Sequence, residues 1–277
     1  MKKLISLGML LGVAIQMATT QVLAVELLMT APPRESKAVG NRLYAPLAQH
    51  IAKITGASVR YQHPGNWFNY QRNMRKGKYD IIFDGPHFVS WRKVHLQHDV
   101  LVKLPGQLEF YLLANKDDHA INTLDDLMRK KICAMPLPDL SSLSVLDRYR
   151  NPVRQPVIVG VKGGMAKVYQ AFKRGKCRAV VLRTTFYREK MTQEQRNTMK
   201  ILFHSKPRPN QAISVSRKLD ANAKHKIIQS LTVGDGVQAS KAILERFGGE
   251  GVKSFVRVKD TEYDRHNELL EGIIFGW

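Results

Sequence analysis

The sequence predicts a two-lobed α/β protein in which each lobe is a mainly parallel sheet flanked by helices. Three observations predict this fold class. The chain has 277 residues, which is long enough for two lobes with separate cores. An alternation of apolar strands and amphipathic helices occurs twice along the chain. Two strand-like segments connect the alternating sets, which predicts a two-strand hinge.

The first alternation predicts the sheet of lobe 1. Its strands read as short apolar runs, and its helices have apolar residues at helical spacing and end at a glycine. The expected elements are strand 25–30, helix 41–55, strand 57–62, helix 66–76 and strand 79–83. Leu43, Leu47 and Ile51 set the period of the first helix, and Gly56 ends it. Such an order predicts parallel strands with helices on both faces.

The second alternation predicts lobe 2 and the return of the chain. The expected elements are strand 108–114, helix 123–130, strand 131–135, helix 142–150, strand 157–161, helix 165–174, strand 178–183, strand 211–216, helix 221–232 and helix 238–247. We therefore assign residues 25–114 and 211–277 to lobe 1, and residues 115–210 to an inserted lobe 2. A ligand of such a fold is expected between the lobes, beyond the carboxyl ends of the strands.

The first 24 residues predict a secretory signal peptide. Lys2 and Lys3 precede a short apolar run at 4–18, and the residues up to Ala24 suit a signal peptidase. The run is shorter than a typical membrane span, and the absence of a following Cys argues against a lipid anchor. We expect cleavage after Ala24 and a monomeric protein in the periplasm.

The charge of the chain points to an anionic partner. The formal net charge is +21, and the central part is the most basic. Residues 115–210 contain 20 Lys and Arg against 8 Asp and Glu, which gives +12. A basic surface favours anions, although the same charges can also form a solvated face. Export, and the lack of a basic tail, argue against nucleic acid as the partner.

The strongest local candidate for a ligand site is a serine-rich segment. Ser141, Ser142 and Ser144 lie where a predicted strand is followed by a helix. Hydroxyl and N–H groups at a helix start can hold a phosphate-like group. The alternative is that these serines only cap the helix.

Two further segments offer side chains to the predicted cleft. His87 follows Gly85-Pro86 at the end of a strand, and it can either donate to an anion or lie on a surface loop. The Gly-Pro turn lets the backbone approach a ligand. Trp67 begins a predicted helix, and it can either line the cleft or pack in the core.

Catalytic and metal-binding constellations are not apparent in the sequence. His95 and His98 form an HxxH pair without a third ligand nearby. The serines lack a Gly-x-Ser-x-Gly context, and no nucleophile is placed beside Asp84 and His87. We expect a binding protein without a cofactor or metal rather than an enzyme.

Several segments together resemble the periplasmic phosphate/phosphonate-binding proteins of ABC transporters, the PhnD-like family. The similar segments are, in order, 44–47 (YAPL), 55–56 (TG), 75–83 (RKGKYDIIF), 85–88 (GPHF), 139–144 (DLSSLS) and 208–210 (RPN). The resemblance implies a type-2 periplasmic binding fold in which the three serines hold the phosphonate oxygens. It also implies aromatic contacts from Tyr44 and from His87 or Phe88.

The chain departs from the family pattern at two places. The segment around Lys162 lacks a His that the family often has, and Lys162 can supply the charge instead. Arg178 stands where the family has an acid, and Arg183 follows on the same strand. An acid would suit an amino group on the ligand and Arg does not. We therefore expect phosphate, phosphite, another oxyanion or a carboxylate rather than an aminoalkylphosphonate.

The resemblance also bears on the cysteines and the partners. It places Cys133 and Cys177 at the start of neighbouring strands, where an oxidising compartment allows a disulfide. The predicted function is to bind a small anion and deliver it to a membrane permease. The alternative is a sensor of the same fold that docks to a histidine kinase or chemoreceptor in the periplasm. Both alternatives predict the same ligand-binding cleft.

Overall fold

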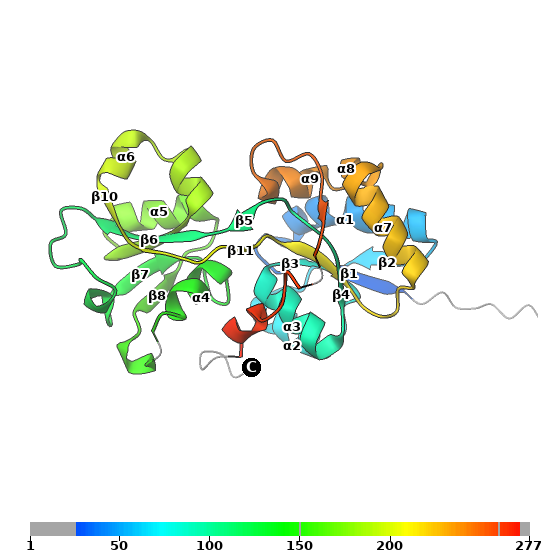
Figure 1. Ribbon diagram of the computed structural model, residues 1–277, viewed down its shortest axis with the longest axis horizontal. Helices are drawn as coiled ribbons and strands as arrows, with labels where there is room; N and C mark the ends of the chain where they lie inside the picture. Colours follow the sequence, from blue (N-terminus) through cyan, green and yellow to red (C-terminus); the bar gives the residue numbers. More distant parts are fainter. Residues whose placement is uncertain (1–25, 150, 260, 272–277) are drawn as a thin grey trace, which may run out of the picture.

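The computed structural model describes residues 26–149, 151–259 and 261–271, and these form two α/β lobes side by side (Figure 1). Each lobe contains its own sheet with helices packed against it, and a narrow two-stranded connection joins them. This arrangement confirms the predicted fold class. The predicted signal peptide, residues 1–24, lies outside the described residues. Within the described part of the chain, no helix is both long and apolar enough to cross a membrane.

Lobe 1 is built on a six-stranded sheet with the order β13-β4-β12-β3-β1-β2. Its strands are β1 (Leu27–Thr30), β2 (Val59–Tyr61), β3 (Ile81–Asp84), β4 (Asp99–Lys103), β12 (Ala212–Val215) and β13 (Val256–Arg257). β1 is parallel to β2 and β3, whereas β12 is antiparallel to both β3 and β4. The sheet is therefore mixed, because β12 returns from lobe 2 in the opposite direction.

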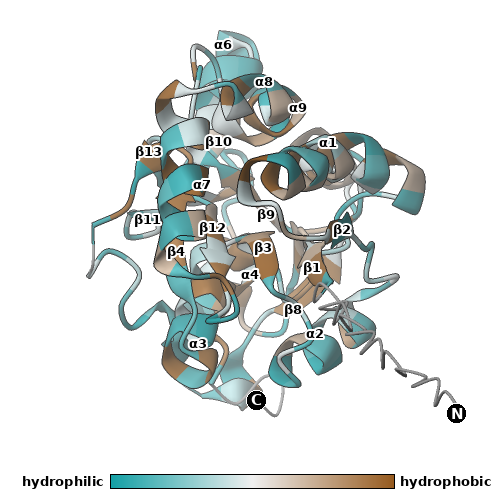
Figure 2. Ribbon diagram, turned by 90° about the vertical axis from the view of Figure 1, so that its right-hand side faces the viewer, coloured by the Kyte–Doolittle hydropathy of each residue, from teal (hydrophilic) through white to brown (hydrophobic). Residues whose placement is uncertain are grey.

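Helices cover both faces of the lobe 1 sheet. They are α1 (Lys37–Thr55), α2 (Trp67–Arg75), α3 (Pro86–Leu96), α7 (Ala221–Val233), α8 (Gly236–Ala239), α9 (Lys241–Ile243) and the π-helical turn η4 (Leu244–Gly248). Ile81 and Phe83 of β3 pack with α1 and α7, whereas Ile82 packs with α2 and α3. Alternate side chains of a strand point to opposite faces, and both faces are covered here, which explains why the strand is apolar up to its last residue, Asp84. Figure 2 shows β3 as hydrophobic and the outer surface of α7 as largely hydrophilic.

Lobe 2 is built on a five-stranded sheet with the order β10-β6-β9-β7-β8. Its strands are β6 (Phe110–Asn115), β7 (Lys131–Ala134), β8 (Val157–Gly160), β9 (Ala179–Arg183) and β10 (Met199–His204). β7, β8 and β9 are parallel, and β6 runs antiparallel to β9 and β10. Its helical segments are η1 (Asp125–Leu127), α4 (Leu140–Leu146), η2 (Pro152–Arg154), α5 (Met165–Lys173), η3 (Phe186–Lys190) and α6 (Gln193–Asn197).

The hinge is a two-stranded antiparallel ladder between the lobes. It consists of β5 (Gln107–Leu108) and β11 (Arg208–Pro209). β6 follows directly and belongs to the lobe 2 sheet, although we had placed the lobe boundary after it, at residue 115. The C-terminal segment, which contains the 3-10 turn η5 (His266–Leu269), packs beside α3. Arg208 donates a 2.9 Å hydrogen bond to the ring of His266 in that segment.

Two predicted helices differ from the structure, and α3, β4 and β10 were not predicted. Segment 123–130 was expected as a helix, but it contains only the short turn η1, in which Thr123 and Asp126 form the expected reciprocal bonds. Segment 238–247 was expected as one helix, but it is divided at Ser240, whose hydroxyl bonds back to the carbonyl oxygen of Gly236. The helix α3 was not predicted, because it has no clear apolar period.

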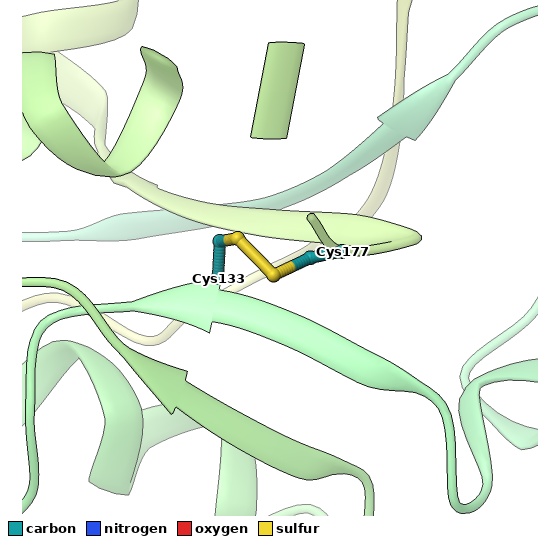
Figure 3. Close-up of a disulfide and its surroundings, with 2 residues drawn as sticks. All are labelled: Cys133 and Cys177. Atoms are coloured by element: carbon teal, nitrogen blue, oxygen red, sulfur yellow. A yellow bond between two sulfur atoms is a disulfide. The ribbon is translucent and has the colours of Figure 1, made fainter. Parts of the chain in front are cut away.

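Cys133 and Cys177 form a disulfide in lobe 2 (Figure 3). Cys133 lies on β7 and Cys177 lies just before β9, its parallel neighbour. The Cα atoms are 5.5 Å apart, a usual separation for a disulfide. The bond therefore ties together the two central strands of lobe 2, and both cysteines are buried.

Candidate ligand-binding site

Two cavities lie between the lobes. The smaller has a volume of about 280 Å³, and it is lined by Pro33, Arg34, Glu35, Ser36, Gly65, Asn66 and Trp67 of lobe 1 and by Met135, Pro136, Lys162 and Gly163 of lobe 2. The larger has a volume of about 690 Å³ and is lined by residues 163–166, 183, 185, 186, 189 and 190 of lobe 2 and by residues 245–247, 249 and 250 of lobe 1. The larger has a size typical of ligand sites, and the smaller is slightly below that range. The cleft between the lobes therefore has space for a ligand, at the place where this fold class predicts one.

The start of α4 is already capped by an acidic side chain. Asp139 is the N-cap residue and accepts hydrogen bonds from the backbone N–H and the hydroxyl of Ser141, at 2.9 Å and 2.6 Å. Ser142 donates its hydroxyl proton to the carbonyl oxygen of Met135, at 2.5 Å. Only Ser144, of the three predicted serines, has a buried hydroxyl without a partner. Asp139 thus accepts from the N–H and hydroxyl groups of Ser141 that were expected to hold an anion.

A buried cluster of two arginines and one carboxylate lies at the end of β3. Asp84 is completely buried, and its carboxylate accepts a hydrogen bond from Arg92 at 3.2 Å and contacts Arg34 at 3.5 Å. The same carboxylate also accepts from Tyr70 and from the N–H of Gly85. Burial raises the pKa of the Asp84 carboxyl, and the two guanidinium groups oppose that shift. Asp84 is the carboxylate that acts on Arg92, whereas Glu35 and Asp139 also act on Arg34.

Arg34 is the part of this cluster that reaches the cleft. Its side chain is 12% exposed and lines the smaller cavity. Its Nη1 atom is buried and has no hydrogen-bond partner. A buried hydrogen-bond donor without a partner destabilises the folded protein, unless a ligand accepts the hydrogen bond. Arg34 was not among the residues predicted from the sequence. Its position could have been suspected, because Arg34 follows the turn residues Pro32 and Pro33 at the carboxyl end of β1.

His87 is buried between the lobes rather than on a surface loop. The residue is 2% exposed and lies in the first turn of α3, after Gly85 and Pro86. Its Nε2 atom lies 3.1 Å from the carbonyl oxygen of Pro138, in the segment that precedes α4. Burial, reinforced by neighbouring arginines, lowers the pKa of the ring to about 3. His87 is therefore neutral near physiological pH and bridges the two lobes.

Tyr44 lies in the core of lobe 1, whereas Trp67 lies on the lobe 1 side of the interface. Tyr44 of α1 is fully buried, its hydroxyl has no partner, and its ring lies 5.2 Å from that of Tyr61. Burial raises the pKa of Tyr44 well above its usual value, so its hydroxyl keeps its proton. Trp67 begins α2, lines the smaller cavity and stacks on Phe88 at 6.0 Å. Tyr44 can therefore donate one hydrogen bond, and Trp67 provides an apolar wall.

The basic residues predicted in lobe 2 fall into two groups. Lys162 lines the smaller cavity and Arg183 lines the larger one. The Nε atom of Arg183 is buried without a partner, and desolvation lowers the pKa of its guanidinium. Arg178 instead lies outside both cavities, is 47% exposed and pairs with Asp118 through hydrogen bonds of 2.8 Å and 2.6 Å. The expectation that excluded aminoalkylphosphonates on the basis of Arg178 therefore has no support from the cleft.

The histidine pair His95–His98 does not form a metal site. His95 is bonded to Glu271 at 2.7 Å, whereas His98 is buried. Among the residues that the structure describes, no group of three or more His, Cys, Asp or Glu side chains could hold a metal ion.

The fold and the cleft define a two-lobed binding protein. The family model described as "ABC transporter, phosphonate, periplasmic substrate-binding protein" matches residues 29–263. The chain therefore belongs to the phosphonate-binding periplasmic protein family of ABC transporters. Members of this family are the substrate-binding components of transporters. No curated protein matches the sequence.

Three solved structures share this fold at low sequence identity. A Prochlorococcus marinus protein, PhnD1, in complex with methylphosphonate has a TM-score of 0.65 at 12% identity, over 89% of this chain and 97% of that one. The Xanthomonas citri protein XAC2383, bound to ATP, has a TM-score of 0.67 at 12% identity, over 88% and 95%. A phosphonate-transporter binding protein from Pseudomonas aeruginosa has a TM-score of 0.60 at 15% identity, over 86% and 83%. They show the fold alone, a type-2 periplasmic binding fold.

Proposed function

We propose that the protein captures a small oxyanion of the phosphate, phosphite or phosphonate class between its lobes and delivers it to the membrane permease of an ABC transporter. The observation that carries the proposal is a set of buried donors without partners. Arg34 Nη1 and the hydroxyl of Tyr44 come from lobe 1, and Ser144 Oγ and Arg183 Nε come from lobe 2. Arg34 lines the smaller cavity and Arg183 the larger one, so a tetrahedral oxyanion in the smaller cavity would accept from Arg34 and have lone pairs left for further donors.

Electrostatics support an anion rather than a neutral ligand. Arg34 and Arg92 share the single carboxylate of Asp84, and Lys162 and Arg183 face the cleft from lobe 2. A bound anion would offset the excess positive charge. Glu35 also lines the smaller cavity, and its carboxylate has no hydrogen-bond partner although Arg246 lies 3.7 Å away. A test panel should therefore include aminoethylphosphonate beside the simple oxyanions.

The proposal is tested by calorimetric binding of phosphate, phosphite, methylphosphonate and aminoethylphosphonate to the mature protein. Arg34→Ala should weaken the best ligand roughly ten- to a hundredfold, because a hydrogen bond to a charged group contributes about 1.5–3 kcal/mol. Arg178→Ala is the matched control, since it removes an arginine that pairs with Asp118 outside the cleft. Failure of every oxyanion to bind, or equal losses in both variants, would refute the proposal.

Delivery to a permease requires export, which we also propose. Sequencing the amino terminus of the protein purified from a periplasmic fraction should give Val25 as the first residue. Size-exclusion chromatography with light scattering should give the mass of a monomer. An intact Met1, or a protein retained in the cytoplasm, would contradict this part of the proposal.

A further inference from the structure

The hydrogen bond between the lobes fixes which nitrogen of His87 carries the proton. The carbonyl oxygen of Pro138 can only accept, so Nε2 of His87 must be the donor across the 3.1 Å contact. In a neutral imidazole the other nitrogen then has no hydrogen and presents a lone pair. The structure therefore makes Nδ1 of His87 an acceptor, whereas the sequence had suggested a donor to an anion.

This acceptor is buried and has no partner. Nδ1 of His87 makes no hydrogen bond, and it lies beside Gly85, which has no side chain to cover it. A Cβ atom on Gly85 would lie 3.2 Å from Nδ1 and 3.9 Å from Nη2 of Arg34. The Nη1 atom of the same guanidinium is also buried without a partner. The unused acceptor and the guanidinium that carries the unused donor thus both lie close to the space that a side chain on Gly85 would fill.

The charges around the ring keep it neutral. Arg34, Arg92 and Arg208 are the positive groups that act on it, and Asp84, Glu35 and Asp139 act on the guanidinium of Arg34. A second proton on the ring would add a buried charge among three cations, which is unfavourable. The lone pair on Nδ1 is therefore available throughout the physiological pH range.

We propose that His87 and Arg34 together recognise a protonated oxyanion, with Arg34 Nη1 donating to an ionised oxygen and His87 Nδ1 accepting the proton of a P–OH group. This inference rests on the proposed function and narrows its substrate class. An oxyanion without a proton would place an oxygen lone pair against the lone pair of Nδ1 and leave a buried acceptor unpaired. The site therefore selects monoprotonated phosphonates and phosphates, and it rejects sulfate and sulfonates, which carry no proton near neutral pH.

The direct test compares methylphosphonate with methanesulfonate by calorimetry at mildly acidic pH. Both are then mainly tetrahedral monoanions of similar size, and they differ in that only the phosphonate has an O–H group. Methylphosphonate should bind the wild-type protein about ten- to a hundredfold more tightly, because an unsatisfied buried acceptor costs about 1–3 kcal/mol.

Two variants assign the preference to the ring nitrogen. His87→Leu should bring the affinity ratio of the two ligands close to one, whereas His87→Gln should keep part of the preference, because its amide oxygen can accept. Circular dichroism and thermal melting check that both variants fold. Equal wild-type affinities for the two ligands, or an unchanged ratio in His87→Leu, would overturn this inference while leaving oxyanion capture intact. Absence of binding by all oxyanions would overturn both.

Discussion

Asp84 and Arg92 form an ion pair inside lobe 1, with 3.2 Å between the carboxylate and the guanidinium and almost no exposure of either side chain. Arg92 also donates to Ser214 on β12 at 3.2 Å and to Tyr70 at 3.1 Å. The pair therefore connects the central strands of the sheet with α2 and α3. Because Asp84 also contacts Arg34, the stability of lobe 1 and the position of the cleft arginine depend on one carboxylate.

We expect Asp84→Asn to destabilise the protein strongly. The substitution leaves the buried guanidinium of Arg92 without its counter-charge and removes one of the carboxylates that act on Arg34, and breaking a buried pair typically costs about 3–5 kcal/mol. Urea denaturation of the ligand-free protein measures the change in the free energy of unfolding. Glu26→Gln is the control, because it breaks an exposed pair with Arg60 and should produce little change. Similar effects of the two variants would show that the buried pair is not required for stability.

The buried neutral state of His87 predicts a loss of stability in acid. Its pKa is about 3 in the folded protein and about 6.5 in an unfolded chain, so the unfolded state binds more protons between these values. Stability should therefore fall as pH falls below about 6.5, and His87 alone should contribute about 2 kcal/mol of loss by about pH 5. Denaturation at several pH values measures this slope.

The variant His87→Leu tests that assignment. It removes the titrating group, so the dependence of stability on pH should become shallower. The dependence should not vanish, because the pKa values of His98 and His266 are also lowered by burial. An unchanged slope in the variant would mean that His87 does not set the acid sensitivity.

The sequence predicted the two-lobed fold because the fold depends on local patterns. The wholly apolar run at β3 and the glycine stops of α1 and α2 are readable without any tertiary information. The hinge was predicted from the order of the strands along the chain. The position of β6 was not, because its apolar run does not by itself determine which of the two sheets it joins. Its pairing with β9 is decided by packing between distant segments.

The candidate site was harder to predict than the fold, because its chemistry comes from distant contacts. Arg34 lies in an irregular turn, and its importance follows from Asp84, 50 positions later in the sequence. His87 was identified, but its role as an acceptor depends on the carbonyl oxygen of Pro138 in the other lobe. Asp139 was read as part of a serine-rich motif, and only the structure shows that its carboxylate caps α4. Arg178 was misplaced because its strand reaches the cleft only at the opposite end.

Removal of the disulfide should lower the stability of the protein. Cys133 and Cys177 are 44 positions apart, and closing a loop of this length contributes about 4 kcal/mol in the chain-entropy description, with about 2–4 kcal/mol typical of measured cases. The double variant Cys133→Ala/Cys177→Ala should have a free energy of unfolding that is lower by that amount, and it should therefore unfold at a lower urea concentration. Intact mass with and without a reductant, in denaturing solution, should differ by two hydrogen atoms. No mass difference would contradict the disulfide.

We expect Leu143 of α4 to stabilise the closed arrangement of the lobes. It is buried in a cluster with Tyr70 and Phe88 of lobe 1 and with Leu270 of the C-terminal segment. We expect Leu143→Ala to favour separation of the lobes, since the substitution removes apolar contact across the interface. Ligand affinity should fall about tenfold, because closure then costs more free energy. Small-angle X-ray scattering of the ligand-free variant should give a larger radius of gyration.

Leu127→Ala separates loss of closure from loss of stability. Leu127 is fully buried in the core of lobe 2 and lines neither of the two cavities. Its truncation should lower the free energy of unfolding by about 2–5 kcal/mol and leave both the radius of gyration and the ligand affinity of the folded protein unchanged. If the two variants bind and scatter alike, the contact of Leu143 with lobe 1 does not control closure. If only Leu143→Ala opens the lobes, the apolar contact between α4 and lobe 1 sets the balance between the open and closed states.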